Sequence, residues 1–313
     1  MPAQHIVGYY DFFLREVVSN FERLRRSGAE QQLILGPWDH GSIGKRTLGE
    51  IDFGPASDFD LPGENLAWFD RILKGSRSKI PAIRYFSMGE NAWREAASWP
   101  PEDAKVMPFY LHSKGKANTR HGDGLVMIGK PASEPYDTFI GDPSQPVPAW
   151  PPAMLQGKFA AFWGPVDQGP NADRSDVLVY DSSPLTRELR IAGPIEAHLW
   201  VSQTTPDADW VVKLIDVLPN GYAQNLAVGI QRASFIRAPR ERPYQVRVDV
   251  GHTAALLKPG HRLRIEITGS YFPLFDRNTN TGQGPYSATS LVARQRVHHT
   301  ANMPSMVLLP IMP

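Results

Sequence analysis

The sequence predicts an α/β segment followed by an all-β sandwich, and two features of its patterning carry that prediction. Residues 1–100 alternate short apolar runs with two amphipathic segments of helical periodicity. After residue 105, short apolar and alternating runs are separated by turns rich in proline and glycine, and no helix of convincing length is indicated. We therefore predict two domains, one over residues 1–104 and one over residues 105–313.

The composition excludes several classes of protein. The chain has 33 basic and 32 acidic residues, so its formal charge of +1 gives no electrostatic argument for a nucleic acid or membrane partner. Without cysteine it has no disulfide, no thiolate nucleophile and no cysteine-ligated metal. No run approaches the roughly 20 apolar residues of a membrane helix. The N-terminus has no signal-peptide pattern, so we expect a cytoplasmic protein, although a preceding segment could carry a signal. A first strand this close to the N-terminus is typical of a truncated domain.

Helices are expected over residues 12–26 and 65–74 of the first domain. The first helix has an apolar series and a basic last turn, and the second ends at Gly75. Strands are expected over residues 32–35 and 82–88, and residues 41–60 are expected to form a loop. The residues predicted to face inward are Phe13, Val17, Val18, Phe21 and Leu24 in the first helix, and Leu66, Phe69, Ile72 and Leu73 in the second.

Asp11 and His40 each end an apolar run, in the turns GYYDFF and GPWDHG. The carboxyl ends of adjacent parallel strands form the usual ligand site of an open sheet. This order therefore predicts a carboxylate beside an imidazole, the orienting acid and general base of a nucleophilic hydrolase. From spacing alone, an ordinary loop histidine bonded to Asp39 is equally compatible, and Asp11 also suits the N-cap of the helix that follows. We assign no role to Asp39.

Three other motifs are rejected as chemical sites. Ser42 in HGSIG lacks the first glycine of a G-x-S-x-G nucleophile elbow, and a loop rather than a helix follows it. Residues 276–280 resemble a calcium loop, but the glycine comes late and Ser287 replaces the bidentate glutamate. His298 and His299 have no third ligand at a suitable spacing and are interpreted as a strand-edge pair.

The second domain is expected to be a β-sandwich, with a jelly roll as the leading topology. Residues 112–174 lack a clear pattern and are expected to be long surface loops. Asp207 and Asp209 are expected to cap a turn, and Trp38, Trp68 and Trp93 to lie in the core or a pocket wall. The predicted strands cover residues 105–111, 175–180, 195–201, 210–217, 230–235, 244–250 and 261–268.

Several ordered blocks of this sequence resemble the cocaine esterase (CocE/NonD) and X-Pro dipeptidyl-peptidase (S15) hydrolases. GYYDFF is similar to their G-W-Y-D-x-F block, and LILGPWDHG to their G-P-W-x-H block. WFDRILKG and RYFSMGENAWREAASWP resemble the end of their catalytic domain. VYDSSPL, TPDADWVVKLIDVLPNG and SYFPLFDRNTNTG resemble their C-terminal jelly roll. The resemblance covers nearly the whole chain.

The resemblance implies the C-terminal portion of an α/β-hydrolase domain followed by a jelly-roll β-sandwich. It makes Asp11 the triad acid and His40 the triad base of a serine hydrolase that cleaves ester or amide bonds through an acyl-enzyme. The family's nucleophilic serine, oxyanion hole and helical cap precede these positions, so we expect this chain to be inactive alone. The alternative is a non-catalytic β-sandwich binding or assembly module with a relict hydrolase segment.

The implied substrate is a small-molecule ester, an amide or a peptide, and no cofactor or metal is expected. A homo-oligomer or a companion chain that supplies the serine is the expected partner, because the first domain should expose a strand edge and an apolar face.

Overall fold

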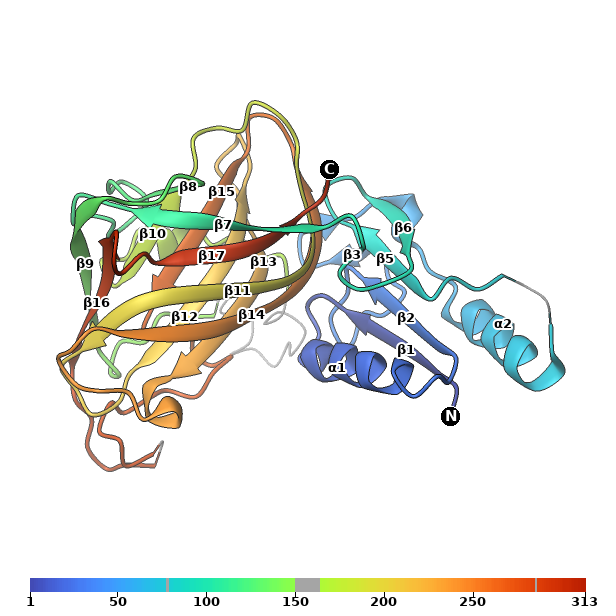
Figure 1. The fold of residues 1–313 in the computed structure, drawn as a ribbon, viewed down its shortest axis with the longest axis horizontal. Coiled ribbons are helices and arrows are strands. Elements are labelled where there is room, and N and C mark those ends of the chain that lie inside the picture. Colours follow the sequence, from blue (N-terminus) through green and yellow to red (C-terminus); the bar gives the residue numbers. More distant parts are fainter. Residues whose placement is uncertain (77–78, 150–163, 285) are drawn as a thin grey trace.

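The computed structural model describes residues 1–76, 79–149, 164–284 and 286–313. A small N-terminal α/β unit lies beside a much larger β-rich unit (Figure 1). The N-terminal sheet has the order β1-β2-β5-β6, with β1, β2 and β5 parallel and β6 antiparallel. The region predicted as a loop, residues 41–60, contains a small β3–β4 hairpin and a 3-10 turn. The elements of the unit are β1 (Ala3–Gly8), α1 (Leu14–Arg25), β2 (Gln31–Gly36), β3 (Thr47–Leu48), β4 (Ile51–Asp52), η1 (Pro55–Ser57), α2 (Leu61–Lys74), β5 (Ile83–Ser87) and β6 (Ala92–Ala96).

Helix α1 packs on this sheet through Val18 and Phe21, both buried as predicted. Two residues of its predicted apolar face are instead exposed. Phe13 lies before the first helical turn, and Leu24 lies in the last turn. Strand β1 forms one edge of the sheet, and none of the described residues pairs with its outer side.

Helix α2 forms as predicted, but the face predicted to point inward is mostly exposed. Asp60 caps its start by accepting from the backbone N–H of Gly63, and Gly75 ends it in the left-handed conformation. Three of the four residues predicted to point inward are exposed, Leu66 at 60 %, Phe69 at 55 % and Leu73 at 75 %, and the fourth, Ile72, is half-buried. Trp68, on the other face, is the buried one. Periodicity identified an apolar face, but nothing in the described parts of the chain covers it.

The β-rich unit begins at β7, and most of the predicted strands occur, often with longer bounds. The region predicted as loops also contains two strands, while the part of it at residues 150–163 lies outside the described residues. The last residues of the strand predicted over 230–235 form the 3-10 turn η4. The elements are β7 (Lys105–His112), β8 (Leu125–Met127), β9 (Ser133–Gly141), α3 (Gly169–Ala172), β10 (Val177–Asp181), β11 (Leu189–Gln203), β12 (Asp209–Val217), β13 (Ala223–Arg232), η4 (Ala233–Ile236), β14 (Tyr244–Leu257), β15 (Arg262–Thr268), β16 (Ala293–Thr300) and β17 (Met306–Ile311).

These strands hydrogen-bond in the order β13-β12-β15-β10-β8-β7-β17-β11-β16-β9, and β14 pairs with β11. The sheet folds over itself, so that β11, β14 and β17 lie in front of β12, β13 and β15 (Figure 1). The two-layered arrangement agrees with the predicted sandwich. The jelly-roll topology and the domain boundary after residue 104 remain predictions.

The two units share one hydrophobic core. A single cluster of buried side chains includes Val7 and Phe86 of the N-terminal sheet together with Tyr180 and Leu257 of the sandwich. Backbone hydrogen bonds also join them, because Met88 donates its N–H to Ala254 O and accepts from Leu256 N–H. The units are therefore packed as one body rather than linked loosely.

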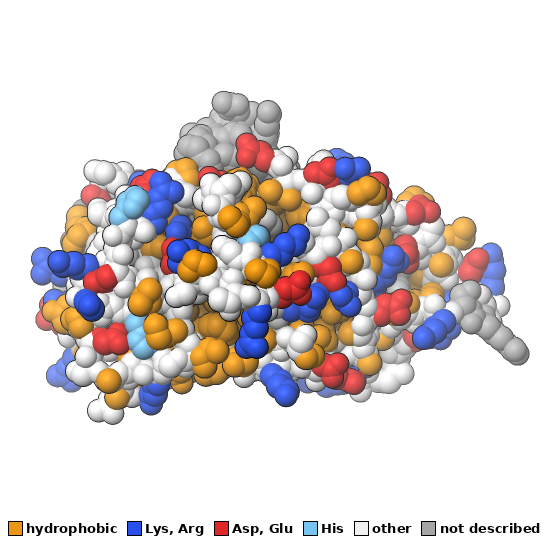
Figure 2. Space-filling model, turned by 90° about the horizontal axis from the view of Figure 1, so that it is seen from above, with side chains coloured by type: hydrophobic (Ala, Val, Ile, Leu, Met, Phe, Trp, Pro, Cys, Tyr) orange, Lys and Arg blue, Asp and Glu red, His pale blue; other side chains and the backbone are white. Residues whose placement is uncertain are grey.

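The surface carries charge of both signs. Acidic and basic side chains are interspersed over the face seen from above, without a field of one sign (Figure 2). This distribution agrees with the nearly neutral charge of the sequence. Among the helices that the structure describes, none is both long enough and apolar enough to span a bilayer.

Candidate active site

The ends of β1 and β2 continue side by side into two loops. Tyr9 donates its backbone N–H to Gly36 O, and Tyr10 donates to Trp38 O, both at 2.9 Å. A side chain at Gly8 would place its Cβ 1.9 Å from Trp38 O, so only glycine permits this approach of the two chains. The pairing extends the parallel register beyond the strands and sets the Asp11 loop against the His40 loop.

Asp11 and His40 meet at this junction. His40 Nδ1 lies 3.0 Å from Asp11 Oδ2, and the other carboxylate oxygen accepts the backbone N–H of Phe13 at 2.9 Å. The Asp11 side chain is 3 % exposed and the His40 side chain 55 % exposed. A buried carboxylate fixed by a helix-start N–H therefore orients an imidazole that faces solvent.

Two phenylalanine rings flank the imidazole. The ring of Phe12 lies 4.8 Å from the His40 ring and that of Phe13 lies 5.3 Å from it, centroid to centroid. Because a carboxylate only accepts hydrogen bonds, His40 donates from Nδ1, and in the neutral imidazole the lone pair is then on Nε2. No group in the described parts of the chain hydrogen-bonds to Nε2, so this atom is free to take a proton from an incoming nucleophile.

The residues next to His40 have structural roles. Asp39 turns away from the imidazole, and its Oδ1 accepts the N–H of Gly41. Ser42 is buried, and its Oγ accepts the N–H of Asp39 at 3.0 Å. Trp38 is fully buried against Phe59 and Trp93. The reading of His40 as a loop histidine bonded to Asp39 is therefore wrong, and Ser42 is no nucleophile elbow.

The sandwich also reaches the Asp11 loop, which sequence reasoning did not foresee. Tyr10 donates its hydroxyl to Asn225 O at 2.9 Å. Arg15 donates to Val228 O at 3.1 Å and to Asp249 O at 2.9 Å. More than 200 positions separate these partners in the sequence, and no local pattern marks them.

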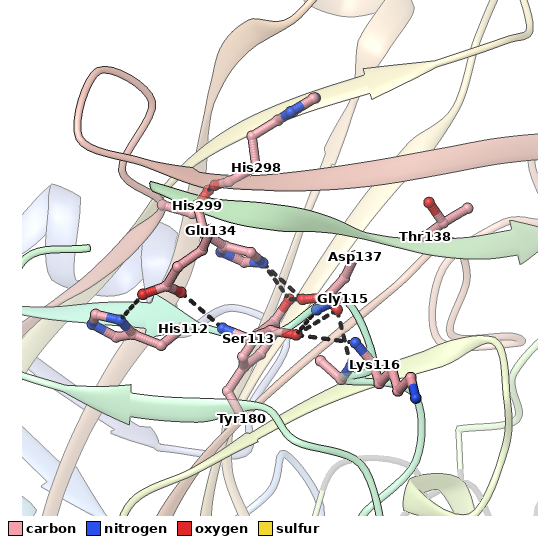
Figure 3. A network of polar contacts seen from close by, with 12 residues as sticks. His112, Ser113, Gly115, Lys116, Glu134, Asp137, Thr138, Tyr180, His298 and His299 are labelled. Carbon is pink, nitrogen blue, oxygen red and sulfur yellow. Dashed lines mark hydrogen bonds and ion pairs between the residues drawn. The ribbon is translucent and has the colours of Figure 1, made fainter. Parts of the chain in front are cut away.

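A second cluster of histidine, aspartate and serine lies inside the sandwich (Figure 3). Asp137 Oδ2 lies 2.7 Å from His299 Nε2, and Asp137 Oδ1 lies 2.7 Å from Ser113 Oγ. Tyr180 donates its hydroxyl to the same carboxylate. The carboxylate stands between serine and histidine, so His299 is not placed to take the serine proton. Asp137 and His299 are also fully buried, which makes this cluster a structural network.

The two remaining motifs are structural as well. His298 and His299 lie in β16, where His299 pairs with Glu134 of β9, and the register of β16 with β11 covers only residues 295–297. In the loop at residues 276–280, Asn278 donates its side-chain amide to Asp209 Oδ1 and Asn280 donates to Leu291 O. Across the described residues, no group of three or more potential ligands is arranged to hold a metal ion.

Comparisons with known proteins agree with this architecture. The family model for the X-Pro dipeptidyl-peptidase C-terminal non-catalytic domain matches residues 78–308. Cocaine esterase from Rhodococcus sp. (strain MB1 Bresler) is 34 % identical over 99 % of this chain and 56 % of its own length. A putative serine esterase of Mycobacterium bovis (strain ATCC BAA-935 / AF2122/97) is 27 % identical over 76 % of this chain and 40 % of its own length.

Two solved structures are similar over essentially the whole chain. An aminopeptidase from a marine sediment Thaumarchaeota archaeon superimposes with a TM-score of 0.87 at 28 % identity, over 100 % of this chain and 55 % of that protein. An α-amino acid ester hydrolase gives a TM-score of 0.86 at 26 % identity, over 99 % of this chain and 55 % of that protein. This chain therefore spans about half the length of the relatives it matches.

Proposed function

Because this chain belongs to the family of cocaine esterase and of the X-Pro dipeptidyl-peptidase C-terminal domain, we propose that it supplies the acid and the base of a serine hydrolase. Asp11 is the acid and His40 is the base. The supporting observation is the 3.0 Å contact between a buried carboxylate and a solvent-facing imidazole at the ends of parallel strands.

In the proposed mechanism, an ester or amide substrate is cleaved through an acyl-enzyme. His40 Nε2 accepts the proton of a serine hydroxyl as the oxygen attacks the carbonyl carbon, and it then passes that proton to the leaving alcohol or amine. Asp11 holds the ring and stabilises the imidazolium that forms. Water attacks the acyl-enzyme by the same proton route and releases the acid product.

The nucleophile comes from outside these 313 residues, which contain no G-x-S-x-G sequence. Two surfaces suit the packing of a nucleophile-bearing part: the edge of β1 and the exposed apolar face of α2, neither of which is covered by the residues that the structure describes. We propose that the N-terminal unit is the last portion of an α/β-hydrolase domain and that the sandwich is a jelly roll. The serine is carried on the same polypeptide or on a companion chain.

A fluorophosphonate probe tests this proposal. The isolated chain is expected to remain unlabelled, because the probe reports an activated serine. A complex or a longer polypeptide that adds a G-x-S-x-G segment is expected to be labelled and to hydrolyse a model ester. Asp11→Asn and His40→Ala are each expected to lower kcat by about 10⁴-fold or more. Stoichiometric labelling of the isolated chain would overturn the proposal that the nucleophilic serine lies outside these 313 residues.

A non-catalytic module remains the alternative, favoured by the description of the family domain that matches residues 78–308. A catalytic role requires the variants at Asp11 and His40 to lose turnover while they keep the binding of the nucleophile-bearing part. Unchanged turnover in both variants would favour the module.

A further inference from the structure

The residue before Asp11 joins three parts of the molecule. Tyr10 is buried, its backbone N–H donates to Trp38 O of the His40 loop, and its hydroxyl donates to Asn225 O of β13. Burial raises the pKa of the Tyr10 hydroxyl, so it keeps its proton and remains a donor. The start of the Asp11 loop is thereby attached to the sandwich.

The other side of the Asp11 loop is attached through Arg15, in the first turn of α1. The Arg15 guanidinium donates to the carbonyl oxygens of Val228 in β13 and Asp249 in β14. Its Nε also lies 3.3 Å from the Asp249 carboxylate. One cation therefore joins two strands of the sandwich to the helix that begins just after Asp11.

The Asp11 loop has contacts with the sandwich in addition to its backbone hydrogen bond with the His40 loop. The His40 loop is fixed within the N-terminal unit, where Trp38 packs between Phe59 and Trp93. The Asp11 loop shares the backbone hydrogen bond from Tyr10 to Trp38 with the His40 loop and is also held by the contacts with β13 and β14. A cavity lined by Tyr10, Asp11, Arg15, Asn225 and His252 follows this seam. A shift of the sandwich against the N-terminal unit would therefore move the carboxylate relative to the imidazole.

We propose that the β-sandwich positions the catalytic acid: Tyr10 and Arg15 anchor the two sides of the Asp11 loop to β13 and β14, and so keep Asp11 in hydrogen-bond contact with His40. Tyr10 and Arg15 are positioning residues, since neither touches the imidazole. The inference rests on the proposed function and extends it, because the family domain that includes β13 and β14 is described as non-catalytic.

The tautomer of His40 gives a readout that a purely structural role would not change. A hydrogen bond to one ring nitrogen decides which nitrogen carries the proton. In contact with Asp11, His40 carries its proton on Nδ1, whereas a free neutral imidazole in water favours Nε2–H. Long-range ¹H–¹⁵N spectra of the ¹⁵N-labelled chain, at a pH where His40 is neutral, measure the two populations.

The variants compared are Tyr10→Phe, Arg15→Met, Arg15→Lys and Asp11→Ala. Arg23→Met is the matched control, since Arg23 is an exposed arginine of the same helix. Loss of the Nδ1–H tautomer is expected to be largest in Asp11→Ala and clear in Tyr10→Phe and Arg15→Met. Arg15→Lys should restore part of it, and Arg23→Met should match the unsubstituted chain. Thermal unfolding of each variant confirms that the spectra come from folded protein.

Two failures are distinguishable. If Asp11→Ala shifts the tautomer while folded Tyr10→Phe and Arg15→Met do not, the positioning role is wrong and the proposed function stands. If Asp11→Ala itself leaves the tautomer unchanged, the dyad is absent in solution and the proposed function fails with it. Tyr10→Phe removes a single hydroxyl, so it remains informative even if Arg15→Met does not fold.

Discussion

Trp99 donates its indole N–H to His252 Nδ1 across 3.1 Å, although the two residues lie 153 positions apart in the sequence. The bond lies at the seam between the N-terminal unit and the sandwich. It requires an unprotonated Nδ1, and burial lowers the pKa of His252 from 6.5 to about 4. The seam therefore depends on a neutral histidine.

The first prediction is a loss of stability in mild acid. In the unfolded chain His252 binds a proton near pH 6.5, whereas in the folded chain it binds one only near pH 4. The free energy of unfolding should thus fall as the pH falls through that interval. His252→Gln should reduce the slope by about 1.4 kcal/mol per pH unit, the value for one proton. Urea unfolding at several pH values measures it.

Burial likewise lowers the pKa of His298 to about 4, so His298→Gln should remove a further part of the same dependence. Equal slopes in the unsubstituted chain and in His252→Gln would contradict the prediction.

The second prediction concerns the buried ion pair of Lys213 and Glu266, which face each other on β12 and β15 at 2.5 Å. Both side chains are fully buried, and desolvation lowers the pKa of Lys213. Removing one partner leaves the other charge buried without its ion-pair partner, so Lys213→Met or Glu266→Leu should each cost about 3–5 kcal/mol. Lys213→Met with Glu266→Leu should cost far less than the sum, which chemical denaturation of all four proteins would establish. Additive losses would show that the pair is not coupled.

The order of helices and strands in the N-terminal unit could be predicted, because the periodicity of a segment and the residue that ends it are both read from neighbouring positions in the sequence. Both Asp11 and His40 follow apolar runs, and parallel pairing brings two such ends to one edge of a sheet. The contacts of Tyr10 and Arg15 with the sandwich could not be predicted, since they use backbone carbonyls of β13 and β14 that no side-chain pattern marks.

Helix α2 shows a second limit of sequence reasoning. The spacing of Leu66, Phe69 and Leu73 correctly indicated an apolar helical face, but a pattern does not say which surface covers it. In β9, Ser133–Gly141, the side chains of Glu134 and Asp137 both hydrogen-bond to Ser113, and the polar residues of the strand leave it without a clear apolar signature.

The third prediction follows from the uncovered face of α2. Leu66→Lys, Phe69→Lys and Leu73→Lys should each change the free energy of unfolding by less than about 0.5 kcal/mol, because these side chains already meet solvent. Self-association of the chain should weaken, as measured by sedimentation velocity. Trp68→Ala, on the buried face of the same helix, should cost about 3–5 kcal/mol. Strong destabilisation by Phe69→Lys would mean that this face is covered within the chain.

The last prediction concerns acid unfolding of the sandwich. Burial raises the pKa of Asp137, but hydrogen bonds and the charge of His299, with hydrogen bonds from Ala117 and Ser113, outweigh burial and hold the pKa below its usual 3.8. The unfolded chain therefore protonates this carboxyl first as the pH falls. The stabilising contribution is complete above pH 3.8 and is lost as the pH falls through the folded-state value.

His299→Leu removes the strongest partner and leaves burial dominant, so the Asp137 pKa should rise and acid unfolding should begin at a higher pH. The loss at neutral pH should be about 1.5–3 kcal/mol, because a buried carboxylate loses a hydrogen-bond partner. Tyr180→Phe removes one hydrogen bond to the same carboxylate, which should cost about 1.5–3 kcal/mol, but it removes no positive charge. Acid titrations followed by tryptophan fluorescence compare the three proteins. An acid midpoint in His299→Leu no higher than in Tyr180→Phe would show that His299 does not hold Asp137 ionised.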